Sequence, residues 1–436
     1  GGGTATGGGT ATGGGTATGG GTATGGGTAT GGGTATGGGG GACVPSGPES
    51  CGDGLDNDCN GATDCADLLA CANQRCGAGQ ACRLGACTCV GPVIVASPDA
   101  GAGEIRTISS VQNPAAQKVA WVIPLRGTLT YAECTSGCST LAPTFTSATI
   151  LSTTVVSASI AARPNGGVSA AALSEAMNRF DLLYGECSMG CLTATNWTWT
   201  VVDTDVDDVT PRIVTASGLT AIAYAAANDS NYAECFAGCT LPAAWSNDKP
   251  FPDSLAARPG LAVSMPLRGY VNANGEYGRC TQASCTSGAG NWARISTTAA
   301  AGEGGALRFN DAGVPRVFGQ ALGAIRESRC TTAPCTSSLN FTSVLVTSGA
   351  SRSTQLDVAF DGQERGAIVY PSTTGSNSGL SAAREGPDGG WTTSAVPACG
   401  SAFVGVLPVA ELTSSGDLRA FFHATPTRDI RYYVAP

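Results

Sequence analysis

The sequence predicts an all-β fold, a seven-bladed β-propeller preceded by a small disulfide-rich calcium-binding module and an extended Gly-Gly-Gly-Thr-Ala-Thr repeat tract. Three observations lead to this prediction. Residues 92–436 repeat with a period near 50 residues, each unit alternates short apolar runs with Gly, Asn or Asp turns, and most units carry the same cysteine and aromatic markers. A period of this length, made of strands and turns, is typical of a propeller blade.

The N-terminal tract, residues 1–41, begins with six exact copies of the hexapeptide Gly-Gly-Gly-Thr-Ala-Thr. In an extended strand the even period places both threonines on one face. A polyproline-II helix of period three also leaves a narrow Gly/Ala edge. Free in water the tract would be a flexible coil, because Gly raises backbone entropy and no apolar surface is available to bury. A simple linker between an anchor and a head is therefore the alternative to an ordered tract.

We expect the threonines of this tract to carry O-linked glycans and the tract to be ordered in the core of a fibre. Ordering a bare chain costs roughly 1–2 kcal/mol per residue. Sugars and intermolecular backbone hydrogen bonds would offset part of that cost. Exact repetition suits a one-dimensional lattice, although repeat expansion in the gene also leaves exact copies. The predicted sites are Thr4, Thr6, Thr10, Thr12, Thr16, Thr18, Thr22, Thr24, Thr28, Thr30, Thr34 and Thr36.

The second segment, residues 42–91, is a cysteine-rich module with nine cysteines between residues 43 and 89. It has too few apolar residues for a core of its own, so disulfides are expected to stabilise it. The whole chain has 20 cysteines and a single histidine, His423. This ratio favours disulfides over zinc sites and indicates an oxidising, extracellular or cell-surface location.

Residues 56–67 of the module match the twelve-residue calcium loop of the EF-hand at six positions. Oxygen-bearing side chains alternate along the loop, Gly61 stands where the loop turns sharply, and Asp67 replaces the usual final Glu, which predicts a weak Ca²⁺ site. The alternative is a cluster of Asx turns without metal. The predicted ligands are Asp56, Asp58, Asn60, the carbonyl of Ala62, Asp64 and Asp67.

Residues 51–67 also resemble the Asp/Asn/Cys-rich metal-binding motif of large secreted bacterial surface proteins, with its Asp-Asn-Asp-Cys-Asn-Gly core. The resemblance implies calcium and an extracellular setting, and it implies no activity.

The third segment, residues 92–436, is the propeller, and five of its units share a cysteine marker. Four carry Tyr-x-x-Cys, and the fifth has Glu327 at the tyrosine position. The first cysteines lie 53, 48, 45 and 50 residues apart, and each has a second cysteine four or five residues later. An aromatic residue follows six or seven residues after that. The predicted disulfides are Cys134–Cys138, Cys187–Cys191, Cys235–Cys239, Cys280–Cys285 and Cys330–Cys335.

The sixth unit keeps a strand at 380–384 and Trp391 but has no cysteine pair, and the seventh ends at 430–434 without a fourth strand. The apolar segment 92–97 is the expected donor of that strand, because the sheet edge would otherwise stay open. Cys399, left over in the propeller, is expected to pair with a cysteine of the module. A pair of β-sandwiches is the alternative architecture.

The alternation of strands and turns is similar to that of sialidase-type propellers, and residues 385–391 resemble one Asp-box turn. The other units lack this box, so the resemblance implies architecture only. No motif brings together the arginines that a glycosidase site would need, such as Arg163, Arg258, Arg316 and Arg384. Glu133, Glu186 and Glu234 recur at one blade position and are interpreted as structural, because a catalytic acid is needed only once.

Composition excludes further classes of function. The chain of 436 residues has a net charge of −9 and no basic stripe, so nucleic acid is not an expected partner. It contains no 18-residue apolar run that would span a membrane. No signal peptide is visible, which is expected of a processed or incomplete sequence.

We therefore expect a non-enzymatic structural protein, a self-associating subunit of an O-glycosylated extracellular fibre, with the propeller as its head. A stalked surface propeller that binds glycan or protein is the second hypothesis. A sialidase-like glycosidase is the third.

Overall fold

The computed structural model describes residues 44–436 apart from single residues and short loops, the longest being 98–104, 112–116, 252–259, 298–304, 373–378 and 397–403. The predicted glycosylation sites, Thr4 to Thr36, and Cys399 lie outside the described residues. Among the described residues, no helix has the length and apolar character needed to cross a membrane.

The cysteine-rich module folds around sulfur rather than around apolar side chains. A short 3₁₀ helix, η1 (Asp64–Ala66), precedes an antiparallel sheet of β1 (Arg75–Gly77), β2 (Gln80–Arg83) and β3 (Ala86–Cys89). Disulfides join Cys51 to Cys71, Cys65 to Cys82 and Cys76 to Cys87. Cys65, Cys71 and Cys82 form the buried cluster of the module. The disulfides thus take the place of the core that the composition cannot supply.

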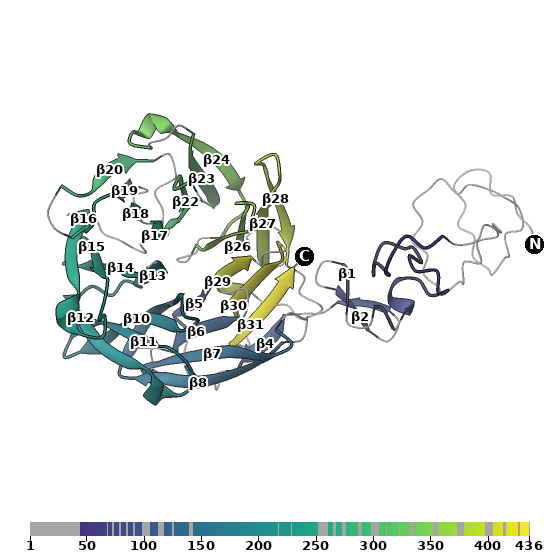
Figure 1. Ribbon diagram of the computed structural model, residues 1–436, viewed down its shortest axis with the longest axis horizontal. Coiled ribbons are helices and arrows are strands. Elements are labelled where there is room, and N and C mark those ends of the chain that lie inside the picture. The colour runs from purple at the N-terminus through teal and green to yellow at the C-terminus, as the bar shows by residue number, and fades with distance from the viewer. Residues whose placement is uncertain are drawn as a thin grey trace, which may run out of the picture. The chain divides into compact units, whose positions relative to one another are not determined.

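The propeller has seven four-stranded antiparallel sheets, as predicted, arranged around a central axis (Figure 1). Blade 1 contains β5 (Thr107–Val111), β6 (Lys118–Ile123), β7 (Thr128–Ser136) and β8 (Thr144–Ser152). Blade 2 contains β9 (Val155–Ala162), β10 (Val168–Ala176), β11 (Arg179–Cys187) and β12 (Thr198–Val206). Blade 3 contains β13 (Arg212–Ala216), β14 (Leu219–Ala226), β15 (Asp229–Cys235) and β16 (Ser246–Phe251). Blade 4 contains β17 (Gly260–Ser264), β18 (Leu267–Val271), β19 (Glu276–Cys280) and β20 (Ala293–Ser296).

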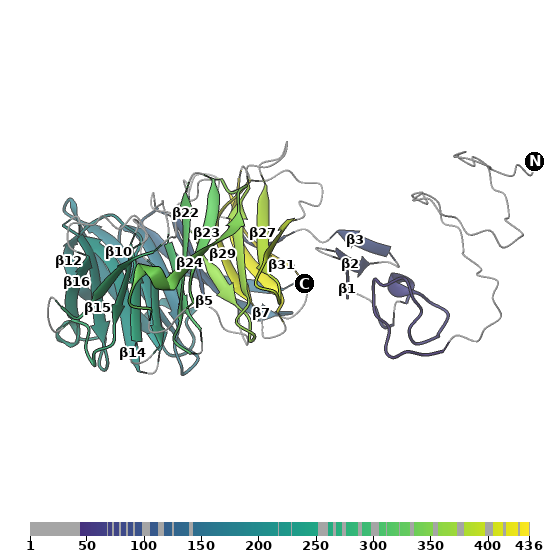
Figure 2. The ribbon, with the colours of Figure 1, turned by 90° about the horizontal axis from the view of Figure 1, so that it is seen from above.

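Blade 5 contains β21 (Gly305–Phe309), β22 (Pro315–Ala321), β23 (Ala324–Cys330) and β24 (Phe341–Thr347). Blade 6 contains β25 (Val358–Phe360), β26 (Gly366–Pro371), β27 (Leu380–Glu385) and β28 (Trp391–Ala395). Blade 7 contains β29 (Val404–Leu412), β30 (Leu418–Thr425), β31 (Asp429–Ala435) and β4 (Val93–Ala96). Short 3₁₀ helices, η3 (Ala194–Asn196), η4 (Pro242–Ala244) and η5 (Ser338–Asn340), precede the fourth strands of blades 2, 3 and 5. Figure 2 views the blades from the side, with their strands running between the two faces of the propeller.

The strand that closes the ring comes from the beginning of the propeller segment, as the sequence predicts. β4 pairs antiparallel with β31, and Ile430 lies opposite Ala96. The hydroxyl of Ser97 donates to Asp429 Oδ1 over 2.8 Å beside this pairing. The predicted closure by residues 92–97 is therefore confirmed.

An aromatic side chain at the start of the fourth strand packs against the preceding blade. Edge-to-face contacts join Tyr184 to Trp245 and Tyr232 to Trp292, each with ring centroids 5.0 Å apart, and Tyr277 to Phe341 at 6.1 Å. These pairs join the third strand of one blade to the fourth strand of the next. The recurring aromatic is thus a wedge between blades.

In three of the five marked blades the cysteine pair helps to orient this wedge. The structure holds the five propeller disulfides with the pairings expected from their spacing. The carbonyl of the second cysteine accepts a hydrogen bond from the indole nitrogen of Trp197, Trp245 and Trp292, over 2.8, 2.8 and 3.1 Å. The loop closed by the disulfide therefore has two functions, since it ends one strand and positions the next aromatic.

Blade 6 lacks the cysteine pair and fixes its wedge in another way. The indole nitrogen of Trp391 donates to Glu327 Oε2 over 3.1 Å, and its ring packs edge-to-face on Phe318. Glu327 also pairs with Arg316 and Arg329, and both arginines reach Glu385 of blade 6. This network explains why a glutamate replaces tyrosine at position 327.

Candidate functional site

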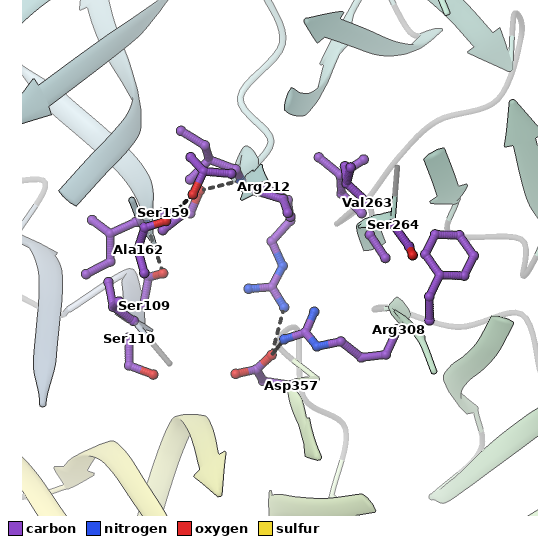
Figure 3. Close-up of a pocket in the computed structure, with 18 of the residues that line it drawn as sticks. Ser109, Ser110, Ser159, Ala162, Arg212, Val263, Ser264, Arg308 and Asp357 are labelled. Carbon is purple, nitrogen blue, oxygen red and sulfur yellow. Dashed lines mark hydrogen bonds and ion pairs between the residues drawn. The ribbon is translucent and has the colours of Figure 1, made fainter. Parts of the chain in front are cut away.

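A cavity of about 520 Å³ lies at the centre of the ring, where the first strands of the blades converge (Figure 3). β5, β9, β13, β17 and β21 contribute most of its wall, and Asp357 contributes from the residue before β25. First strands of a propeller face the axis, so a polar side chain on them is available to a molecule in the channel.

Two arginines from different blades converge on one carboxylate in this cavity. Arg212 is the first residue of β13, and Arg308 lies near the end of β21. Arg212 Nη2 lies 3.3 Å from Asp357 Oδ1, and Arg308 Nη2 lies 3.6 Å from the same oxygen. Figure 3 shows both guanidinium groups directed toward Asp357.

The second oxygen of Asp357 has a structural role. Asp357 Oδ2 accepts a hydrogen bond from the backbone nitrogen of Ala410 in β29, which ties blade 6 to blade 7. Two serines of the cavity wall tie other blades in the same way. Ser109 Oγ accepts from Ile160, and Ser159 Oγ accepts from Ile213, over 3.0 and 3.1 Å. These oxygens are therefore fixed in place, while each serine hydroxyl keeps its hydrogen to donate.

The balance of charge in the cavity is positive. Arg212 and Arg308 face the single carboxylate of Asp357. Burial lowers the pKa of Arg308, Asp357 opposes the shift, and the charge of Arg212 adds to it. Arg212 also donates to the carbonyl of Leu356 and Arg308 to that of Leu307, over 3.3 and 3.2 Å. Each guanidinium has five N–H donors, more than these acceptors can satisfy. The geometry suits an added anionic group that would bridge both arginines.

The arginines and glutamates singled out in the sequence do not form this site. Arg163 pairs with Glu186 at 3.0 Å, Arg316 belongs to the blade 5–6 network, and Arg384 donates to the carbonyl of Gly416. Arg258 lies outside the described residues. Glu133, Glu186 and Glu234 each accept from the tyrosine two residues earlier, over 2.5, 2.9 and 3.1 Å.

Sequence reasoning missed Arg212 and Arg308. A usable signal did exist, because each is a charged residue on a short, otherwise mainly apolar first strand.

The predicted calcium loop brings several of its oxygens together. Carboxylate oxygens of Glu49, Asp56 and Asp58 lie within 4.8 Å of one another. The side-chain amide of Asn60 donates to Asp58 over 3.1 Å and to Asp67 over 2.8 Å. Glu49 lies outside the twelve-residue loop pattern, so the sequence does not predict it among the ligands.

Asp64, the predicted ligand at position nine, has a different set of partners. Its Oδ1 accepts from the backbone nitrogens of Gly52, Asp53 and Gly54, over 2.6, 3.1 and 3.2 Å. The backbone of Ala62 donates to Asn60 Oδ1 over 2.8 Å. The carboxylate of Asp64 thus orders the preceding 52–54 turn.

Comparison with known proteins yields no family model and no curated protein that matches the chain. Among solved structures, a streptogramin B lyase matches with a TM-score of 0.50 and 9% identity, over 78% of this chain and 96% of that chain. The likeness to the streptogramin B lyase supports the propeller fold alone.

An intramolecular trans-sialidase from Ruminococcus gnavus matches with a TM-score of 0.41 and 10% identity, over 79% and 97% of the two chains. The WD40 domain of Toxoplasma gondii coronin matches with a TM-score of 0.47 and 9% identity, over 79% and 83%.

Proposed function

We propose that this protein is an extracellular, non-enzymatic binding protein whose propeller holds an anionic ligand in the central cavity. The observation that carries the proposal is the convergence of Arg212 and Arg308 on the single carboxylate of Asp357. Among the described residues that line the cavity there is no histidine, cysteine or tyrosine, so its wall is better suited to hold a ligand than to activate one. The many disulfides support an oxidising location.

Binding of acetate and sulfate, measured by calorimetry and ligand-observed NMR, tests this proposal. Arg212→Gln and Arg308→Gln should each weaken anion binding about tenfold or more, because each removes a charge that contacts the ligand. Arg179→Gln is the matched control, since Arg179 lies on β11 with its side chain 47% exposed. Failure of both anions to bind, or equal affinity in all three variants, would overturn the proposal. Turnover of fluorogenic glycosides would refute its non-enzymatic part and favour the glycosidase hypothesis.

A second role rests on the repeat tract. We propose that the protein self-associates into an O-glycosylated fibre with the propeller as its head, and the support is the exact repetition of residues 1–36. Negative-stain microscopy separates this role from a stalked single head, because it shows either regular filaments or separate particles. Mass spectrometry of the tract tests the glycans. Unmodified threonines in a protein that stays monomeric at high concentration would leave only the linker interpretation.

We also propose that the 56–67 loop holds Ca²⁺ and that the ion fixes the loop between its disulfides. The support is the EF-hand spacing together with the proximity of Asp56, Asp58 and Glu49. Asp67 and Asn60 would complete the oxygen set from the other side of the loop. Asp64 would stay with the 52–54 turn, and Glu49 would take its place in the oxygen set.

A further inference from the structure

The polar groups around the arginine pair are mainly hydrogen-bond donors. Among the described residues, Arg212 donates only through Nη2, to the carbonyl of Leu356 and to Asp357. Its Nε and Nη1 hydrogens therefore have no protein acceptor there. Arg308 uses Nη1 on the carbonyl of Leu307 and Nη2 on Asp357, so its Nε hydrogen is also unused. The pair can thus give several further hydrogen bonds to one bound group.

Two serine hydroxyls of the same wall add donors to this set. Ser109 of β5 accepts from the backbone nitrogen of Ile160, and Ser159 of β9 accepts from that of Ile213. In a first strand, the backbone nitrogens that are not paired with the second strand point toward the axis, so the serine oxygens that accept from them lie at the channel. Among the described residues neither hydroxyl hydrogen has an acceptor, so both can be donated to a ligand.

A small recess beside the cavity joins these donors. Ser109, Ser159 and Arg212 line both the cavity and this recess, which has a volume of about 20 Å³. Figure 3 shows both serines on one side of the Arg212 side chain and Arg308 on the other. A space of this size holds about one oxygen atom with its hydrogen-bond partners. An anion on the arginine pair can therefore place one further oxygen between Arg212 and the serines.

Ser110 also lines the cavity but does not belong to this donor set. It faces Glu411 of β29 as a hydrogen-bond partner, and Glu411 lies opposite Arg419 in blade 7. Glu411 and Arg419 are 3% and 8% exposed and are not among the described residues that line the cavity. The buried acid of blade 7 is therefore separate from the ligand site.

The charge of the wall limits the charge of the ligand. Arg212, Arg308 and Asp357 are the ionisable side chains among the described residues that line the cavity, which leaves an excess of one positive charge. A single negative charge neutralises this excess, whereas a second would be repelled by Asp357. A carboxylate has one charge but only two oxygens, and a phosphate monoester has close to two charges at pH 7. A sulfate monoester combines one charge with three terminal oxygens.

We infer that the ligand carries a sulfate monoester, with one oxygen in the recess between Arg212 and the two serines and another directed to Arg308. This inference rests on the proposed function of the cavity. The carbon part of the ligand would occupy the rest of the cavity, whose volume of about 520 Å³ falls in the usual range for small-molecule sites. Val263 of β17 offers it apolar surface on the side of the arginines away from the serines (Figure 3).

Calorimetry of the full chain at pH 7 with methyl sulfate, acetate and methyl phosphate tests the inference. Methyl sulfate should bind about tenfold or more tightly than acetate, because its third oxygen adds hydrogen bonds from the serines. It should also bind more tightly than methyl phosphate, because of the repulsion from Asp357. Ser159→Ala should weaken methyl sulfate about tenfold and leave acetate within about twofold, since acetate can be held by the arginines alone.

Thr107→Val is the matched control for the loss of a contact between blades. Thr107 Oγ1 accepts from the backbone nitrogen of Ala158 over 3.3 Å, one position pair before the contact of Ser109 with Ile160. Thr107 is not among the described residues that line the cavity or the recess, so its variant should bind methyl sulfate as the wild type does. Melting curves confirm folding, and Ser109→Ala replaces Ser159→Ala in the test if the latter does not fold.

The outcomes separate this inference from the proposed function. If methyl sulfate binds no more tightly than acetate or methyl phosphate, or if the serine variants weaken it no more than Thr107→Val does, the sulfate assignment is overturned while anion binding stands. If neither acetate nor methyl sulfate binds, both the inference and the proposed function are wrong.

Discussion

The wedge between blades 4 and 5 offers a direct test of how the ring is stabilised. Phe341 is 5% exposed and meets Tyr277 edge-to-face at 6.1 Å, whereas Leu339, two residues earlier, is 92% exposed. Replacing a buried Phe by Ala costs about 3–5 kcal/mol. An exposed apolar residue normally changes stability by less than about 0.5 kcal/mol. Phe341→Ala should therefore unfold at a clearly lower urea concentration than Leu339→Ala.

A double-mutant cycle isolates the ring contact from general burial. Phe341→Ala and Tyr277→Ala, alone and combined, should show a coupling of about 0.5–1.5 kcal/mol, the usual value for an edge-to-face pair beyond its buried area. Urea unfolding followed by circular dichroism, with the disulfides kept oxidised, gives the four free energies. The wedge interpretation is wrong if Phe341→Ala is as mild as Leu339→Ala, or if the two substitutions add without coupling.

Three further predictions concern other parts of the chain. Val95→Asp, at an 8% exposed position of β4, should open the seam and increase light scattering, whereas Ile94→Asp, at a 51% exposed position, should not. Because the folded pKa of Glu411, about 8, exceeds its unfolded value near 4.3, the native state binds more protons in between, and stability should fall as pH rises through this window. Glu411→Gln should flatten that fall in melting curves from pH 5 to 9, and an unchanged slope would contradict it. Millimolar Ca²⁺ should slow amide exchange in residues 56–67, and Asp58→Asn should remove the effect; elemental analysis that finds no bound metal in millimolar calcium would count against the site.

The blade count and the closing strand could be predicted because both follow from patterns within single units of the sequence. Each unit repeats its strands and turns, four units share the Tyr-x-x-Cys marker, and a seventh unit without a fourth strand leaves an edge that only a strand from elsewhere can cover. The disulfide pairs follow from the short spacing of their cysteines. The role of the aromatic wedge could not be predicted this way, since its partner belongs to the preceding unit about 60 residues away.

The cavity escaped prediction for a related physical reason. Arg212, Arg308 and Asp357 belong to blades 3, 5 and 6, and only closure of the ring brings them together. No local motif connects them, and a charged residue on one mainly apolar strand does not reveal its partners in other blades. Glu411 and Arg419 are close in sequence, yet their burial depends on the packing of blade 1 against blade 7.

The calcium loop shows where a spacing rule meets competing local interactions. The pattern assigns Asp64 to the ion, but three backbone nitrogens of the 52–54 turn converge on the same carboxylate. Glu49 also accepts backbone hydrogen bonds, from Asn57 and Asp64, so its proximity to Asp56 and Asp58 is what distinguishes it from Asp64. The position of Glu49 could not be predicted, because it lies outside the twelve-residue pattern.

The closing strand also determines how the propeller responds to mechanical load. The chain that precedes the propeller enters it through β4, so a pull on the repeat tract reaches the ladder between β4 and β31, in parallel with the disulfide expected between Cys399 and the module. That ladder joins Ile430 to Ala96, Arg431 to Ile94 and Tyr432 to Val93, with a shift of register between the first two pairs. It is short, and the bond between Ser97 and Asp429 adds to it. With that disulfide reduced, tension would open the ladder before the hairpin-linked strands of the other blades, so β4 would be the first strand of the ring to detach.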